Sequence, residues 1–122
     1  MQARLEGKNV LITGGAQGMG AAIAEEYAKH GANVCVGDIN DVGVKTVADR
    51  INANGAGKAI AVKLDVTDRK QVAAAVKATV DAFGSINVML NNAGINKPMM
   101  FLDVTEENWD MIMKVNGLGV LL

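Results

Sequence analysis

The sequence is poor in the residues that build disulfide scaffolds and metal sites. It contains one cysteine, Cys35, which cannot form an internal disulfide, and one histidine, His30. No second histidine or cysteine is placed to share a metal ion, so we predict no metal site. Cys35 lies among valines and is expected to be a small buried hydrophobe rather than a reactive thiol. His30 falls at a predicted helix C-terminus, where a structural role is favoured.

Long apolar runs and blocks of one charge are also missing. No apolar run approaches the ~20 residues of a membrane span, and the first eight residues lack the apolar core of a signal peptide. Twelve basic and thirteen acidic residues give a net charge of −1, and neither sign is concentrated in a run. We therefore expect a cytoplasmic protein that binds neither nucleic acid nor membrane.

The composition predicts one globular domain, residues 1–122, because half of the chain is apolar. Short runs rich in Val, Ile and Leu recur at residues 9–13, 33–37, 59–64 and 87–90, as in strands that are covered on both faces. Helical periodicity separates these runs, with a first helix over 18–30 and a last one from about 105. Asp41 and Asp68 are expected to cap helices, and Gly31 and Gly84 to end them.

Strands and helices in this alternating order predict an α/β fold, a doubly wound parallel sheet with helices on both faces. The usual crossovers place the strands in the order third, second, first, fourth. The chain is expected to stop after the fourth strand and the start of the next helix. The fourth strand would then have an open apolar edge, which favours a homo-oligomer.

A glycine-rich segment, ITGGAQGMGAA over residues 12–22, follows the first strand and opens the first helix. Gly14, Gly18 and Gly20 have the spacing G-x-x-x-G-x-G, and the plain G-x-G-x-x-G pattern is absent. Backbone N–H groups and the helix dipole favour an anion at this point, so a pyrophosphate is the expected ligand. The alternative is a tight turn that binds nothing.

Polar residues follow the other strands as well. Asp38 ends the second strand, where a carboxylate can accept hydrogen bonds from both hydroxyls of an adenosine ribose. A helix cap or a solvated loop acid is the other interpretation of Asp38. Asp65 follows the third strand and Asn91-Asn92 the fourth, and each alone could be a turn former. All four lie where open α/β sheets bind ligands, which indicates a nucleotide site.

Residues 13–20, TGGAQGMG, resemble the TGxxxGxG cofactor loop of the short-chain dehydrogenases/reductases, and residues 91–94, NNAG, are similar to a second element of that family. The resemblance runs from about Leu5 to the end of the chain. It implies a Rossmann-type fold and an NAD-dependent alcohol or polyol dehydrogenase that converts a secondary hydroxyl group to a ketone. A small-molecule alcohol or ketone would be the substrate.

The resemblance also implies the functional residues. Gly14, Gly18 and Gly20 would border the pyrophosphate, Asp65 and Val66 would hold the adenine, and residues 92–94 would lie under the ribose and toward the nicotinamide. The implied cofactor-binding set is Gly14, Gln17, Gly18, Met19, Gly20, Asp38, Ile39, Asp65, Val66, Asn92, Ala93 and Gly94. Asn116 matches an asparagine that helps a water-mediated proton relay in the family. The alternative interpretation is an asparagine tolerated in a helix that Gly117 and Gly119 weaken.

Charge favours NAD over NADP. Asp38 would repel a 2′-phosphate by about 1 kcal/mol or more at intermediate dielectric. Gln17 is neutral, whereas NADP-preferring relatives often carry a basic residue there.

The family's serine and Tyr-x-x-x-Lys pair are not found in this chain. Tyr27, the one tyrosine, is followed four positions later by Gly31 instead of a lysine. We therefore expect the cofactor-binding half of a dehydrogenase, inactive by itself. A non-catalytic nucleotide-binding module or an engineered half-domain is the alternative function, and a methyltransferase of related fold is disfavoured by the two motifs.

Overall fold

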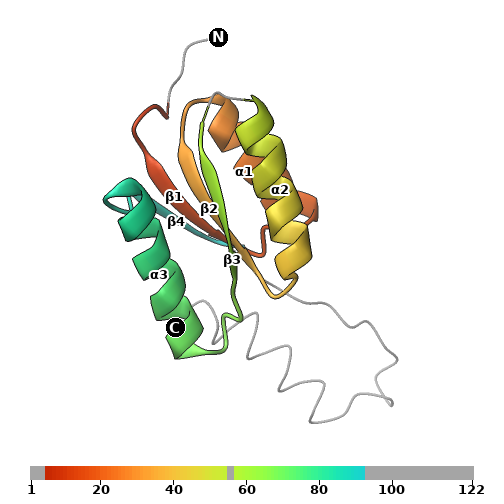
Figure 1. Cartoon of the computed structure of the whole chain (residues 1–122), viewed down its shortest axis with the longest axis vertical. Coiled ribbons are helices and arrows are strands. Elements are labelled where there is room, and N and C mark those ends of the chain that lie inside the picture. Colours follow the sequence, from red (N-terminus) through yellow and green to blue (C-terminus); the bar gives the residue numbers. More distant parts are fainter. Residues whose placement is uncertain (1–4, 55–56, 93–122) are drawn as a thin grey trace, which may run out of the picture.

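The computed structural model describes residues 5–54 and 57–92, which form a four-stranded parallel sheet and three helices (Figure 1). The elements are β1 (Asn9–Thr13), α1 (Gly18–Lys29), β2 (Asn33–Asp38), α2 (Asp41–Asn54), β3 (Ala59–Lys63), α3 (Arg69–Phe83) and β4 (Val88–Asn91). The strand order is β3-β2-β1-β4, and every neighbouring pair is parallel. The predicted fold class and strand order are confirmed.

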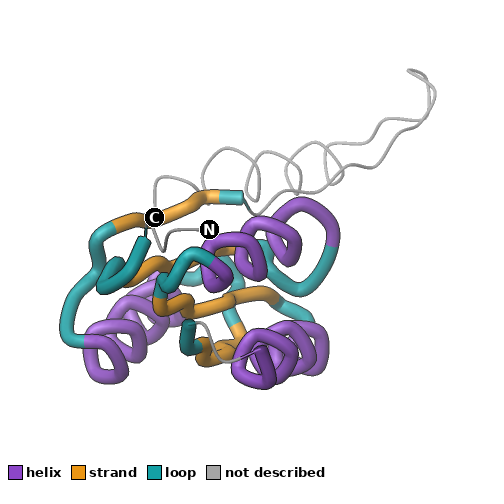
Figure 2. Tube along the Cα trace, turned by 90° about the horizontal axis from the view of Figure 1, so that it is seen from above, coloured by secondary structure: helices purple, strands orange, loops and turns teal. Residues whose placement is uncertain are grey.

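The helices cover both faces of the sheet, with α1 and α2 on one face and α3 on the other (Figures 1 and 2). Val10 and Ile12 of β1 belong to the buried cluster that includes residues of α1 and α2. Leu11 and Cys35 belong to the second cluster, with residues of α3. Alternate side chains of one strand thus enter two different cores, which explains why residues 10–12 of β1 are all apolar.

Cys35 is fully buried, as predicted. Burial raises the pKa of its thiol, and a hydrogen bond with Thr79 opposes this effect more weakly. The side chain therefore remains protonated at neutral pH and acts as a small hydrophobe.

The ends of α1 and α3 follow the expected signals closely. Asp68 caps α3, since its carboxylate accepts hydrogen bonds from the N–H groups of Lys70 (2.9 Å) and Gln71 (3.4 Å). Gly84 ends the same helix in the left-handed region, with φ +96°. α1 ends at Lys29, one residue earlier than predicted, and His30 is its C-cap residue. Glu26 contacts the His30 ring at 3.3 Å, which fits the expected structural role of His30.

The predicted cap of α2 was wrong by one position. Asp41 is the first residue of the helix, and the preceding Asn40 acts as its cap. The Asn40 Oδ1 atom accepts a hydrogen bond of 2.9 Å from the Gly43 N–H, and the Asn40 carbonyl accepts one of 3.1 Å from Val44. Asparagine and aspartate cap helices about equally well, so composition alone could not separate these neighbours.

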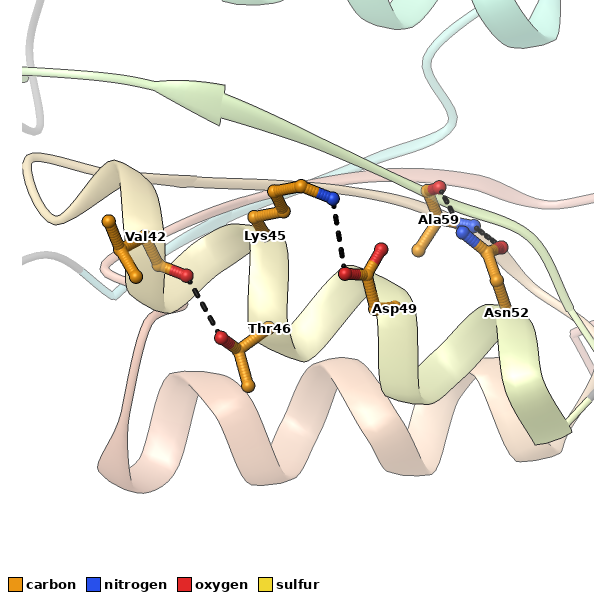
Figure 3. A network of polar contacts seen from close by, with 6 residues as sticks. All are labelled: Val42, Lys45, Thr46, Asp49, Asn52 and Ala59. Atoms are coloured by element: carbon orange, nitrogen blue, oxygen red, sulfur yellow. Dashed lines mark hydrogen bonds and ion pairs between the residues drawn. The ribbon is translucent and has the colours of Figure 1, made fainter.

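The other end of α2 is tied to β3 (Figure 3). The Asn52 side chain donates to the Ala59 carbonyl and accepts from the Ala59 N–H, both at 2.9 Å. On the exposed side of the helix Lys45 and Asp49 form an ion pair of 3.2 Å.

A cluster of asparagines joins the starts of the strands. Asn9, only 5% exposed, donates from its side chain to the Phe83 carbonyl (3.2 Å) and to the Ser85 hydroxyl (3.1 Å). Its Oδ1 accepts from Asn33 (3.0 Å), and its backbone N–H donates to the side chain of Asn87 (2.8 Å). These bonds align β1, β2 and the segment before β4 at the N-terminal ends of the strands. The alignment also sets how the strands end at their carboxyl ends.

Residues 93–122, with the predicted last helix, Ala93, Gly94 and Asn116, lie outside the described residues. Among the helices that are described, none is long and apolar enough to cross a bilayer.

Candidate functional site

The glycine-rich loop between β1 and α1 is held tightly against β2. Gly14 has φ +69°, which allows the chain to turn immediately after the strand. The Gly15 N–H donates to the Gly37 carbonyl at 3.1 Å. A Cβ atom at Gly15 would collide with the side chain of Val36, so the close approach of loop and strand requires glycine there.

The first turn of α1 is open to solvent and uncapped. Gln17, the N-cap residue, is extended and makes no side-chain capping bond, and the first turn contains no acidic residue. Gln17, Gly18 and Met19 are all exposed. In α3, by contrast, the Asp68 side chain occupies the equivalent N–H groups. Because α1 has no such cap, the N–H groups of its first turn and the positive end of its dipole are available to an anion.

Gly18 and Gly20 have different structural reasons to be glycine. Gly18 has φ +60°, and a Cβ atom at this position would meet nothing within 4 Å. Gly20 is buried, and its Cβ atom would come too close to the Gly14 carbonyl and to the Asn92 Nδ2 atom. Gly18 therefore leaves space above the helix, whereas Gly20 lets α1 pack on the loop and on the end of β4.

Asn92 joins the end of β4 to the glycine-rich loop. Its backbone N–H donates to the Thr13 hydroxyl at 3.0 Å, and its Nδ2 atom donates to the Gly14 carbonyl at 3.1 Å. This side chain holds the left-handed turn at Gly14 in place.

Asp38 stands between the glycine-rich loop and the start of α2. Its Oδ2 atom accepts a hydrogen bond from the Ala16 N–H, and its Oδ1 atom accepts one from the Asn40 N–H, both at 3.1 Å. Each carboxylate oxygen keeps a lone pair for a further donor. Among the described residues no ion pair involves Asp38. Next to it, Ile39 is 58% exposed.

Asp65 and Val66 follow β3 at the same edge of the sheet. The Asp65 Oδ1 atom accepts hydrogen bonds from the Thr67 hydroxyl (2.6 Å) and the Thr67 N–H (2.9 Å), and these bonds lower the pKa of the carboxyl group. The Gln71 side chain accepts from the Asp65 N–H at 2.8 Å. Val66 is 7% exposed and packs in the cluster beneath α3, so only its backbone can face a ligand.

The structure brings most of the predicted cofactor-binding residues to the carboxyl edge of the sheet. They are Gly14, Gln17, Gly18, Met19, Gly20, Asp38, Ile39, Asp65, Val66 and Asn92. Sequence reasoning missed Ala16 and Asn40, whose backbone N–H groups hold Asp38. Backbone donors of this kind leave no signal in residue type. No group of three or more His, Cys, Asp or Glu residues is assembled for a metal ion within the two described ranges.

Known proteins resemble this chain over nearly its whole length. A family model described as short chain dehydrogenase matches residues 8–122. The 2,5-dichloro-2,5-cyclohexadiene-1,4-diol dehydrogenase LinX of Sphingobium indicum is 43% identical over 122 residues, which is 100% of this chain and 48% of that protein.

Two solved structures give the same picture. A short chain dehydrogenase from Mycobacterium smegmatis aligns with a TM-score of 0.93 at 32% identity, over 98% of this chain and 50% of that one. A 3-ketoacyl-(acyl-carrier-protein) reductase from Brucella melitensis, complexed with NADH, aligns with a TM-score of 0.85 at 40% identity, over 97% of this chain and 47% of that one. The chain thus spans about half the length of the relatives it matches.

Proposed function

The chain belongs to the short chain dehydrogenase family, and from this premise we propose that the whole protein is an NAD-dependent oxidoreductase acting on a small alcohol or ketone. Interconversion of a secondary hydroxyl group and a ketone is the proposed reaction. A diol dehydrogenase among the relatives and a reductase complexed with NADH among the solved structures support this choice.

The described residues fit a dinucleotide. The uncapped first turn of α1 offers N–H groups to the pyrophosphate, and Gly18 leaves the space above them free of side chains. Asp65 and the backbone of Val66 would hold the adenine. NAD, when bound, supplies the hydride acceptor. Asn92, Ala93 and Gly94 would support the ribose and the nicotinamide, and Asn116 would assist proton transfer.

The surroundings of Asp38 are the main support for NAD as the cofactor. Its carboxylate already accepts two backbone hydrogen bonds and retains acceptor capacity for the ribose hydroxyls. No described lysine or arginine pairs with it. A 2′-phosphate at this place would face an unneutralised carboxylate, which disfavours NADP by about 1 kcal/mol or more.

This chain is proposed to supply the cofactor-binding half of the enzyme. In the family that the sequence resembles, the hydroxyl proton is handled by a tyrosine with a nearby lysine, and Tyr27 lacks that lysine. Residues 1–122 by themselves are therefore expected to bind NAD without turnover.

Titration of the whole protein with NAD and NADP tests the proposal. Asp38→Ala should weaken NAD binding by about tenfold or more, the effect of losing hydrogen bonds to a charged group, and should narrow the difference between the cofactors. Asp49→Ala is the matched control, since Asp49 is an exposed acid that pairs with Lys45. An unchanged NAD/NADP preference in Asp38→Ala would show that Asp38 does not contact the cofactor.

A further inference from the structure

The start of α2 packs directly on the loop that holds Asp38. A Cβ atom at Gly43 would lie 2.9 Å from the Ala16 Cβ atom and 2.7 Å from the Asn40 Nδ2 atom. Both distances are shorter than real Cβ contacts. Gly43 has no positive φ, so its backbone does not require glycine. Glycine at position 43 is therefore explained by the close packing of Ala16 and Asn40, which leaves no room for a side chain.

The two residues that a larger side chain would displace are the two that hold Asp38. Ala16 donates its N–H to one carboxylate oxygen of Asp38, and Asn40 donates its N–H to the other. Asn40 is in turn fixed by the bond of 2.9 Å from the Gly43 N–H to its Oδ1 atom. Gly43 thus packs against Ala16 and Asn40, and these two residues donate to the Asp38 carboxylate.

We propose that Gly43 and Asn40 are positioning residues that fix the Asp38 carboxylate and thereby set the discrimination between NAD and NADP. The inference rests on the proposed function, in which Asp38 binds the ribose hydroxyls. Neither residue needs to touch the cofactor. Their effect is to hold a carboxylate at the place where it can accept from a diol and repel a phosphate.

Gly43→Ala separates this role from a contribution to stability. Alanine favours a helix over glycine, so the substitution does not weaken α2 through its backbone. The added methyl group must instead push away Ala16 or the side-chain amide of Asn40. A shift of Ala16 moves one donor of Asp38 directly, and a shift of the Asn40 amide breaks the bond that fixes the residue carrying the other donor. The expected result is a change in cofactor preference without a matching loss of thermal stability.

The test measures dissociation constants of NAD and NADP by calorimetry on the whole protein, with melting temperatures recorded in parallel. In Gly43→Ala the ratio of NADP to NAD dissociation constants should fall by about tenfold, an effect typical of a small misplacement of a binding group. Asn40→Ala, which adds no atoms and removes the acceptor for the Gly43 N–H, should lower the ratio in the same direction. Asn40→Ser keeps a capping acceptor and should restore most of it. Lys45→Ala, on the exposed side of α2, should leave the ratio unchanged.

Retention of the wild-type ratio by either folded variant, Gly43→Ala or Asn40→Ala, would overturn the proposal. A ratio in Asn40→Ser as low as in Asn40→Ala would also overturn it. If Gly43→Ala does not fold, the two Asn40 variants decide. Asp38→Ala, measured alongside, separates the two levels: an unchanged ratio there refutes the proposed contact of Asp38 with the cofactor, whereas a lowered ratio there with unaffected Gly43 and Asn40 variants refutes only the positioning role.

Discussion

Gly18→Val should have two separate effects, one on protein stability through the backbone conformation and one on NAD affinity through the space above α1. The two effects can be measured independently. Gly18 has φ +60°, a conformation that disfavours a side chain by roughly 1–2 kcal/mol for an ordinary residue and more for a β-branched one. The Cβ position meets nothing within 4 Å, so no clash with the protein adds to this strain. A loss of stability of about 2 kcal/mol is therefore expected from the backbone alone.

The effect on the cofactor comes from occupied space. A valine side chain above the first turn of α1 would displace the pyrophosphate from the N–H groups there. Loss of two hydrogen bonds to a charged group, at about 1.5 kcal/mol each, lowers NAD affinity by about a hundredfold. Calorimetric titration of NAD measures the affinity, and thermal melting measures the strain.

Gly7→Val provides the matched control. Gly7 also has a positive φ, +79°, and a Cβ atom there also meets nothing within 4 Å, but it precedes β1 at the opposite edge of the sheet. The two variants should lose similar stability, and only Gly18→Val should lose NAD affinity. Equal NAD affinities in the two variants would refute the assignment of the glycine-rich loop as a pyrophosphate site.

Three further predictions concern the frame around the site. Asp68→Ala should reduce the free energy of unfolding by about 1 kcal/mol, because α3 loses its cap; an unchanged denaturation midpoint would contradict this. Asn9→Ala should reduce the free energy of unfolding by about 1–3 kcal/mol in chemical denaturation, since it removes three side-chain hydrogen bonds made by a buried residue. A loss no larger than that of exposed Asn54→Ala would argue against the asparagine cluster. Thr67→Val should raise the pKa of Asp65 in an NMR titration. Because the folded-state pKa of Asp65 is lowered, its stabilising contribution is present above the unfolded value and is lost as the pH falls through the folded value. Thr67→Val should therefore be less stable than the wild type above the unfolded-state pKa of Asp65, and the difference should shrink as the pH falls through the folded-state pKa. An unmoved titration of Asp65 would contradict the assigned hydrogen bonds.

The fold was predictable because each strand is a short apolar run, although only the central strands β1 and β2 are buried along nearly their whole length and β3 and β4 are partly exposed. β1 was predicted with its observed bounds, and the bounds predicted for the other strands differ from the structure by one residue at one or both ends. Boundaries depended on local competition that residue types do not settle, as at Asn40 and Asp41. The asparagine cluster was not predicted, because Asn9 and Asn87 are far apart in the chain and meet only in the folded sheet.

The residue types of the candidate site were predictable, but the hydrogen bonds that hold them in position were not. Glycines and acids after parallel strands indicated a nucleotide at one edge of the sheet. The pairing of Asp38 with the Ala16 N–H joins residues on different loops through a backbone donor, which no side-chain pattern reports. The same limit applies to Val66, whose buried side chain leaves only its backbone for a ligand.

A crystal structure of the whole protein with NAD bound would test the proposed site most directly. We predict that the ribose hydroxyls of the adenosine lie within hydrogen-bond distance of the Asp38 carboxylate, and that the pyrophosphate lies over the first turn of α1 at Gly18. A dinucleotide bound elsewhere, or an Asp38 carboxylate that faces away from the ribose, would contradict the proposed function.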